Sequence, residues 1–232
     1  GSNAFVKYIQ ENTRIPVLGH SEGVCHGYID KLADTDKSLR ICLDSKLQYP
    51  AACNAMETLL IHKDIAEKVL PNLVAQFKGE QVELVGCVKT CQIVPEVASA
   101  NESDWDMEYN ELKLSIKIVD SFSEAVKFIN RHGSGHTDVI ITESQERAEQ
   151  FLNEVSSSSV MWNASTRFAD GFRYGLGAEI GISTNRTHAR GPVGLEGLII
   201  YKYKLYGNGQ VAGDYSGANA REFTHKPLTP AM

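Results

Sequence analysis

Hydrophobic and polar positions alternate along residues 26–163 in two rhythms, one typical of strands and one typical of helices. Short apolar runs are followed by stretches with apolar residues at helical spacing, such as Leu39, Cys42, Leu43 and Leu47. Strands are predicted at 26–30, 56–62, 82–87, 112–119, 138–142 and 160–163. Helices are predicted from Asp34 or Thr35 to 48, from 64 with a kink or restart at Pro71, from 121 or 123 to 131, and over 143–155. This order predicts an α/β fold with a mostly parallel sheet.

The chain changes character after this region. Seven glycines fall between Phe168 and Gly197, and Leu198 to Tyr206 then alternates apolar and basic residues. The alternation predicts one long strand with an aromatic face. It has no hairpin mate nearby, so we expect it to pair with a sister subunit or with a segment outside this sequence. The acidic, polar residues 101–110 predict a loop.

Composition narrows the class of protein. Hydrophobic residues at 42% and charged residues at 22% are ordinary globular values. The net charge of -6 argues against nucleic acid or an anionic membrane surface as the main partner. Five cysteines without framework spacing, and no signal peptide, indicate a reducing compartment. No apolar run approaches the roughly 20 residues that span a bilayer. Residues 1–4 look like an expression scar.

The strongest chemical candidate is Cys53, in the run Tyr-Pro-Ala-Ala-Cys-Asn-Ala at 49–55. The cysteine follows a proline-led turn and precedes an apolar run. A thiol at the end of a rigid turn is presented to a cleft, and its own backbone N–H can donate to an oxygen on the carbon that the sulfur attacks. This is the minimum equipment for covalent acyl transfer. The alternative interpretation is a small buried hydrophobic residue, which most cysteines are.

Two other motifs carry weaker signals. The run from Gly175 to Gly181 resembles a dinucleotide-binding fingerprint, but its third glycine comes one place late and no complete βαβ unit frames it. A glycine-rich substrate loop is favoured there. His132, His136 and Asp138 would suit a metal only on a helix, which the intervening glycines break. Turn and capping roles are favoured, and no metal site is predicted.

Five blocks of sequence together resemble the gamma-glutamyl phosphate reductases (glutamate-5-semialdehyde dehydrogenases) of the aldehyde dehydrogenase superfamily. The blocks are 14–26, 49–60, 131–138 (Arg-His-Gly-Ser-Gly-His-Thr-Asp), 162–184 and 188–197. The resemblance runs from about residue 7 to the end. The sequence around Gly19 to Gly23 and around Cys53 is most similar to that of the C-terminal reductase module of eukaryotic delta-1-pyrroline-5-carboxylate synthase. A stand-alone eukaryotic reductase is the close competitor.

The resemblance implies an aldehyde dehydrogenase-like fold and a reaction of proline biosynthesis. NADPH reduces gamma-glutamyl phosphate to glutamate gamma-semialdehyde through a cysteine thioester, with release of phosphate. Residues 5–20 are then the end of the cofactor domain, 21–190 the catalytic domain, and 191–232 an oligomerisation strand and tail. Most of the cofactor domain lies outside this sequence. We therefore expect the chain alone to be inactive and to bind NADPH weakly or not at all.

The resemblance also assigns roles near the thiol. The family nucleophile falls on Cys53, and its N–H, or the side chain of Asn54, is the expected oxyanion donor. The carboxylate that holds the nicotinamide-side ribose maps to Glu108, with Glu111 a close alternative. Hydrolytic aldehyde dehydrogenases carry a general-base glutamate in the block that is 17–21 here, and the aligned position is apolar. Loss of that base fits a reductase that must avoid hydrolysis.

A second group of residues is expected to bind substrate. Charge density alone favours a solvated face for Arg167, Asp170 and Arg173. The resemblance places the segment from Asn163 to Arg173 along the substrate cleft. An arginine fork matches either the glutamate carboxylate or the phosphate. With the resemblance included, an anion-binding cluster and a solvated face are equally favoured for these three residues.

Partners and compartment follow from the resemblance alone. The expected partners are gamma-glutamyl phosphate, further copies of the chain and a fused glutamate kinase domain. A mitochondrial location is expected for the bifunctional enzyme and a cytoplasmic one for a stand-alone reductase. Two alternatives stay open, a non-catalytic assembly module and another aldehyde dehydrogenase-like acylating enzyme. A catalytic Cys53 should be alkylated faster than the other four cysteines near neutral pH.

Overall fold

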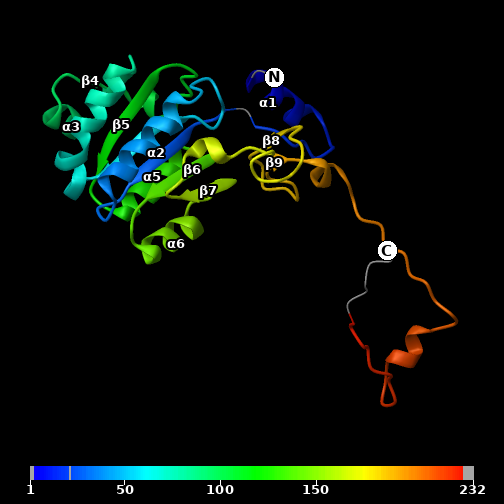
Figure 1. Ribbon diagram of the computed structural model, residues 1–232. Helices are drawn as coiled ribbons and strands as arrows, with labels where there is room; N and C mark the ends of the chain where they lie inside the picture. The colour runs from blue at the N-terminus through cyan, green and yellow to red at the C-terminus, as the bar shows by residue number, and fades with distance from the viewer. Residues whose placement is uncertain (1–2, 21, 227–232) are drawn as a thin grey trace. The chain divides into compact units, whose positions relative to one another are not determined.

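The computed structural model describes residues 3–20 and 22–226, which fall into two units, 1–199 and 200–232. A seven-stranded sheet forms the centre of the first unit, in the order β4-β3-β5-β2-β1-β6-β7 (Figure 1). Every neighbouring pair of these strands is parallel. The strands are β1 Cys25–Ile29, β2 Met56–His62, β3 Glu83–Gly86, β4 Ala98–Ser99, β5 Lys113–Val119, β6 Thr137–Ile141 and β7 Ser159–Trp162, and a separate antiparallel hairpin joins β8 Gly181–Ser183 to β9 Gly191–Val193.

Helices connect the strands of the sheet. None of the helices in the described residues is long and apolar enough to cross a membrane. The α-helices are α1 Asn3–Asn12, α2 Thr35–Leu47, α3 Lys63–Gly79, α4 Val88–Ile93, α5 Phe122–His132 and α6 Gln145–Glu154. Short 3₁₀ helices cover Glu102–Asp106, Thr166–Phe168, Leu195–Leu198 and Ala212–Tyr215.

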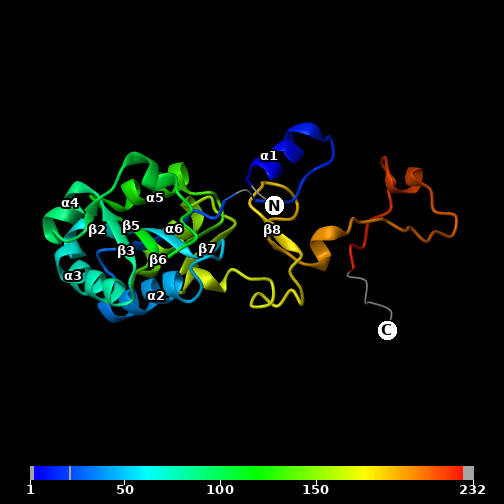
Figure 2. The same cartoon turned by 90° about the horizontal axis from the view of Figure 1, so that it is seen from above.

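The sheet is covered on both faces, with α2 and α3 on one side and α5 on the other (Figure 2). Side chains along β2 alternate between the two cores: Leu59 and Ile61 pack with α2 and α3, whereas Leu60 packs with α5 and α6. A strand buried on both faces has no side that faces water, and its centre, 59–61, is an unbroken apolar run. The predicted α/β class and mostly parallel sheet are confirmed.

Local signals placed most helix ends correctly. Asp34 caps α2 by accepting a hydrogen bond from the Lys37 N–H at 2.8 Å, and Ser121 caps α5. The sequence predicts a kink or restart of α3 at Pro71, but the helix continues from Lys63 to Gly79 without a break. Pro71 lies on the exposed side, and the buried residues around it continue the apolar face that packs on the sheet.

The expected strand over 198–206 is wrong for this chain. Residues 199–206 form no strand, and Tyr203 and Leu205 are each 96% exposed. A strand exists only where its backbone groups have a neighbour to pair with, and the described part of the chain provides none. The alternating sequence of 199–206 could form a strand beside a partner strand, but it has none among the described residues.

Two connections hold more structure than their sequence suggested. The expected loop at 101–110 contains a 3₁₀ helix, closed by a capping box in which Asn101 and Asp104 exchange side-chain and backbone hydrogen bonds. The segment after β3 forms α4 and the short strand β4, neither of which the apolar pattern predicted. Both elements are too short to show a period.

A buried ion pair joins α2 to β2. Lys46 Nζ lies 2.5 Å from Glu57 Oε2, and both side chains are fully buried. Burial raises the pKa of Glu57 to about 7 and lowers that of Lys46, because each charge has lost its water. The backbone N–H of Asn110 donates to the other carboxylate oxygen at 3.3 Å. The pair fixes α2 above the start of β2.

Lys46→Met is expected to lower the free energy of unfolding by ~3 kcal/mol or more, because it leaves a buried carboxylate without its cation. Adding Glu57→Leu should recover most of the loss. Urea denaturation measures both variants. The matched control is Lys37→Met, which breaks the exposed 2.8 Å pair with Glu143 and should change stability by less than ~1 kcal/mol. Equal losses for Lys46→Met and Lys37→Met would contradict the assignment.

Candidate active site

The thiol lies where the central strands begin. The strands β2, β1 and β6 are neighbours and parallel, so their first residues share one edge of the sheet. Cys53 precedes β2, Gly23 precedes β1 and His136 precedes β6. Side chains far apart in sequence are therefore brought together at the amino edge of the sheet. This edge is the candidate active site.

The predicted proline-led turn is present. The N–H of Ala52 donates to the carbonyl of Tyr49 at 3.2 Å, and the N–H of Ala55 donates to the carbonyl of Ala52 at 2.8 Å. Cys53 lies between these two bonds and is partly exposed. The turn ends directly in β2, so the buried strand anchors it.

The backbone before β1 packs directly on the Cys53 turn. A Cβ atom at Gly23 would lie 2.1 Å from the carbonyl oxygen of Cys53 and 2.7 Å from its Cα. No side chain fits in that space. The Cys25 thiol also donates to the same carbonyl oxygen at 3.3 Å. The position of the nucleophile candidate is therefore set by backbone-to-backbone contact.

The electrostatic environment keeps the Cys53 thiol protonated. Burial raises its pKa to about 11, and the carboxylates of Glu108 and Glu179 add to the effect, while its own N–H and Arg167 oppose it. At Cys87, burial is outweighed by hydrogen bonds from Thr90 and the Ile118 N–H, and the pKa is lowered. These pKa shifts argue against the expectation that Cys53 is alkylated fastest near neutral pH, since the thiolate is the reactive form.

The predicted charged cluster is assembled beside the thiol. Arg167 Nε donates to the Gln48 amide at 2.8 Å, and Arg167 lies 5.8 Å from the Tyr49 ring centroid. The Arg173 guanidinium donates to the carbonyl of Arg167. Asp170 accepts the N–H groups of Phe172 and Arg173, each at 3.0 Å, so it holds the turn that carries Arg173. The structure brings Arg167, Asp170 and Arg173 together.

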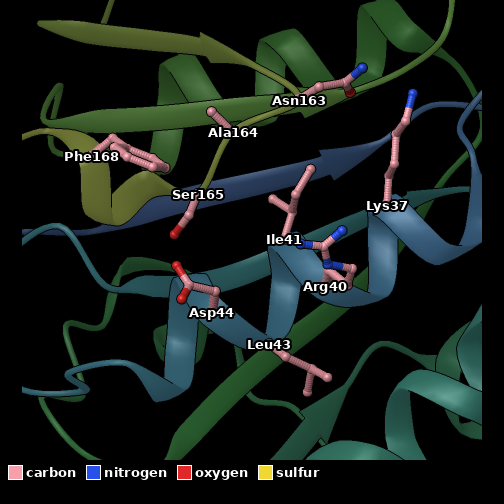
Figure 3. Close-up of a pocket in the computed structure, with 9 residues that line it drawn as sticks. All are labelled: Lys37, Arg40, Ile41, Leu43, Asp44, Asn163, Ala164, Ser165 and Phe168. Atoms are coloured by element: carbon pink, nitrogen blue, oxygen red, sulfur yellow. The ribbon is translucent and has the colours of Figure 1, made fainter.

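A pocket of about 160 Å³ lies against this cluster, lined by Asp44, Gln48, Arg167, Phe168 and Arg173. A larger pocket of about 680 Å³ adjoins it between α2 and residues 163–168. Figure 3 shows Lys37, Arg40 and Asp44 on the α2 side of the larger pocket, facing the segment that follows β7. Both pockets combine cationic and anionic groups.

Asn163 is not brought to the thiol. Its Oδ1 accepts from the Thr142 N–H at 3.0 Å and its Nδ2 donates to the Thr142 carbonyl at 2.9 Å. Thr142 follows β6 and Asn163 follows β7, so this contact lies at the carboxyl edge of the sheet, opposite Cys53. The amide therefore fastens two strand ends. Its expected role in substrate binding has no support from its position.

The other two predicted residues lie near the thiol. Asn54 is 5% exposed, and its Nδ2 donates to the carbonyl of Ala169 at 2.8 Å, which fastens the thiol turn to the arginine-bearing segment. That bond uses one of the two amide hydrogens, so the backbone N–H of Cys53 is the better candidate for an oxyanion donor. Glu108 is half-buried and close enough to raise the pKa of the thiol.

Two histidines complete the edge, and sequence reasoning did not place them there. His20 and His136 meet edge to face, with ring centroids 5.3 Å apart. Burial, and then the neighbouring charge of His20, lowers the pKa of His136 to about 3, so its ring is neutral. The available signal was position: both histidines lie in segments that lead into a predicted strand, although His20 lies six residues before the strand predicted at 26–30.

The histidine group inferred from sequence is dispersed. His132 Nδ1 lies 2.7 Å from an Asp106 carboxylate oxygen, and Asp138 accepts from the N–H and ring of His26 at 2.8 and 3.0 Å. The fingerprint-like run 175–181 leads into the antiparallel strand β8, not into a helix. It therefore lacks the strand-turn-helix setting that a dinucleotide phosphate loop needs.

Comparison with known proteins defines the class first. No family model matches the chain. An acetylating aldehyde dehydrogenase from Geobacillus thermoglucosidasius superposes with a TM-score of 0.64 at 17% identity, over 90% of this chain and 56% of that one. This likeness shows the fold: the chain has an aldehyde dehydrogenase-like fold, with a cysteine on a turn at the amino edge of its sheet.

Closer relatives define the family. A gamma-glutamyl phosphate reductase of Acetivibrio thermocellus is 58% identical over 228 residues, which is 98% of this chain and 52% of that protein. The crystal structure of gamma-glutamyl phosphate reductase from Thermotoga maritima superposes with a TM-score of 0.88 at 43% identity, over 91% of this chain and 51% of that one. Over nearly its whole length the chain is therefore similar to gamma-glutamyl phosphate reductases, and it spans about half the length of the curated relatives it matches.

Gly23→Ala is expected to lower the free energy of unfolding by ~2 kcal/mol or more, because the added methyl group meets backbone that cannot turn away. It should also change the alkylation rate of Cys53, measured by mass spectrometry of the cysteine peptides. Gly79→Ala is the matched control, since a Cβ there meets nothing within 4 Å. If the two variants unfold at the same urea concentration, the close approach of Gly23 is not a constraint.

The alkylation rate of Cys53 should rise about tenfold per pH unit between pH 7 and about pH 10, because only the thiolate reacts. A pKa raised to about 11 leaves the thiol protonated over this range. Cys87, whose pKa is lowered, is the internal control and should level off at lower pH. Timed iodoacetamide labelling with peptide mass spectrometry follows both residues. A shared plateau would refute the different environments.

Proposed function

We propose that this chain is the thiol-bearing half of an enzyme that reduces gamma-glutamyl phosphate to glutamate gamma-semialdehyde in proline biosynthesis. The observation that carries the proposal is the Cys53 turn, fastened by Gly23 and facing Arg167, in a chain 58% identical to a gamma-glutamyl phosphate reductase. A nucleophile, an oxyanion donor and an anion-binding side chain are the groups that transfer from an acyl phosphate requires.

Cys53 performs the first step. Its thiol gives up a proton to solvent, and the sulfur forms a bond to the acyl carbon of the substrate. The carbon–oxygen bond to the phosphate breaks, phosphate leaves with the electron pair, and a thioester on Cys53 remains. The carbonyl oxygen carries negative charge in the transition state. The N–H of Cys53 lies beside that oxygen and stabilises the charge without reorganising.

Glu108 is the residue of this chain best suited to hold the cofactor. It is a half-buried carboxylate close to the thiol, and a carboxylate accepts hydrogen bonds from ribose hydroxyls. NADPH, when bound, supplies the hydride that reduces a thioester to an aldehyde. Cys53 then leaves as a thiolate. We place the pyrophosphate contacts outside this chain, because the run 175–181 leads into the antiparallel pair of β8 and β9 and not into a helix.

Arg167 is the proposed anchor for an anionic group of the substrate. Its Nε bonds the neutral amide of Gln48, and none of the ion pairs between described residues includes it. A guanidinium that is partly buried and paired only with neutral groups retains its charge for a ligand. Arg173 adds a second positive charge at the same pocket.

Self-association and cellular compartment are the two remaining parts of the proposal. We propose that the exposed apolar side chains of residues 199–206 meet another copy of the chain. Similarity to a reductase of the bacterium Acetivibrio thermocellus favours the cytoplasmic alternative over the mitochondrial one. A role as a non-catalytic assembly module would need only that exposed segment and not the thiol turn.

In a full-length enzyme that contains this chain, Cys53→Ala is expected to lower activity by ~10⁴-fold or more, because the covalent route is lost. Activity is followed as phosphate-dependent formation of NADPH from glutamate gamma-semialdehyde and NADP⁺. Cys91→Ala is the control and should stay within about twofold.

Three results are then distinguishable. Near-normal activity of Cys53→Ala would leave the assembly module as the better explanation. Activity that needs coenzyme A in place of phosphate would indicate the alternative acylating enzyme. Loss of activity in both variants would point to damage to the fold, which circular dichroism of each variant checks.

A further inference from the structure

Three potential metal ligands converge at the amino edge of the sheet. One ligand atom each of His20, Cys53 and His136 lies within 4.8 Å of the other two. They come from the segments entering β1, β2 and β6, so the parallel sheet itself sets their spacing. Of these three side chains, the mechanism proposed above uses only the sulfur of Cys53 and gives the two histidines no role.

The hydrogen bonds of both rings prepare them for metal binding. His20 Nδ1 lies 3.2 Å from the carbonyl oxygen of Ile182, which can only accept, so the proton is on Nδ1 and the lone pair is on Nε2. His136 Nδ1 bonds the Thr137 hydroxyl at 2.8 Å. Metal-binding histidines usually have one ring nitrogen fixed in this way while the other faces the ion.

His136 gives an independent indication of a ligand. Its side chain is 1% exposed, and its Nε2 has no hydrogen-bond partner among the described residues. A buried nitrogen left without a partner is unfavourable by about 1–3 kcal/mol. A cation bound by this nitrogen would remove the penalty.

We propose that Cys53, His20 and His136 bind a zinc-type divalent cation with one coordination position left open. Sulfur and imidazole nitrogen are the ligands that Zn²⁺ prefers, whereas Mg²⁺ and Ca²⁺ select oxygen. Tetrahedral zinc holds such atoms about 3.3–3.7 Å apart, so the ligands need to close by about 1 Å. The metal displaces the thiol proton, which passes to solvent, and a metal–sulfur bond replaces the sulfur–hydrogen bond.

Metal binding would switch off the nucleophile. A sulfur that donates its lone pair to the cation does not attack an acyl carbon, so the bound metal would be a reversible inhibitor. This consequence rests on the proposed function, whereas the binding itself does not. The site is open to a cation because Cys53 and His20 are both partly exposed.

Equilibrium dialysis of the chain against Zn²⁺, after treatment with a chelator, tests binding without substrate or cofactor. The expected result is one ion per chain, with no uptake of Mg²⁺. His20→Gln, His136→Asn and Cys53→Ser should each weaken binding by ~tenfold or more. Cys91→Ser and His225→Gln are matched controls that keep the site intact and should bind Zn²⁺ normally. Cd²⁺ gives a second readout, a sulfur–cadmium charge-transfer band that is lost only in Cys53→Ser.

His136 is buried, so His136→Asn is read together with His20→Gln, which replaces a partly exposed ring. Unchanged affinity in His20→Gln and Cys53→Ser, or no saturable binding to the unaltered chain, overturns the site. Binding with normal affinity but without slower alkylation of Cys53 also overturns it, since the metal would then lie elsewhere. Failure of the catalytic proposal would instead appear as normal turnover by Cys53→Ala in the full-length enzyme, with zinc binding by this chain intact.

Discussion

The structure depends most on one close contact, between the backbone before β1 and the turn that carries Cys53. A Cβ at Gly23 would lie 2.1 Å from the Cys53 carbonyl oxygen, so only glycine lets these two segments meet. The thiol is positioned by backbone that belongs to two neighbouring buried strands, and such strands do not shift separately. The Cys25 thiol donates to the same carbonyl and prevents that oxygen from being buried unsatisfied. The backbone that carries the reactive atom is therefore anchored to the centre of the sheet.

Topology explains how the remaining groups reach the same edge. In a parallel sheet the strands begin together, so the segments that enter β5, β2, β1 and β6 converge without any contact in sequence. Helix α2 runs back from the carboxyl edge to the amino edge and ends beside the thiol turn. The segment after β7 follows it: Asn163 is fastened near the carboxyl edge, whereas Arg167 reaches Gln48 at the end of α2. Contact with the end of α2 therefore holds Arg167 near the thiol, whereas Asn163 stays at the carboxyl edge.

The sequence predicted those features of the fold that depend on periodicity and on local signals. The β-α-β-α order, the caps at Asp34 and Ser121 and the turn before Cys53 all follow from residues close together in the chain. It could not predict what depends on packing. The alternation in residues 198–206 needs a partner strand to become structure, and α4 is shorter than two helical turns. The approach of His20 and His136 to Cys53 depends on sheet order, which no local pattern encodes.

The pKa of the thiol is set first by burial and then by Glu108, Glu179, the N–H of Cys53 and Arg167. Burial raises the pKa of Cys53 to about 11, which favours the protonated thiol at neutral pH. The charges that act on it, at the rim of the site, are those of Glu108 and Glu179, which raise the pKa, and that of Arg167, which lowers it. A ligand that covers this rim removes water from these charges and strengthens each of them. Covering this edge therefore acts on the pKa of the thiol in both directions, since the two carboxylates raise it and Arg167 lowers it.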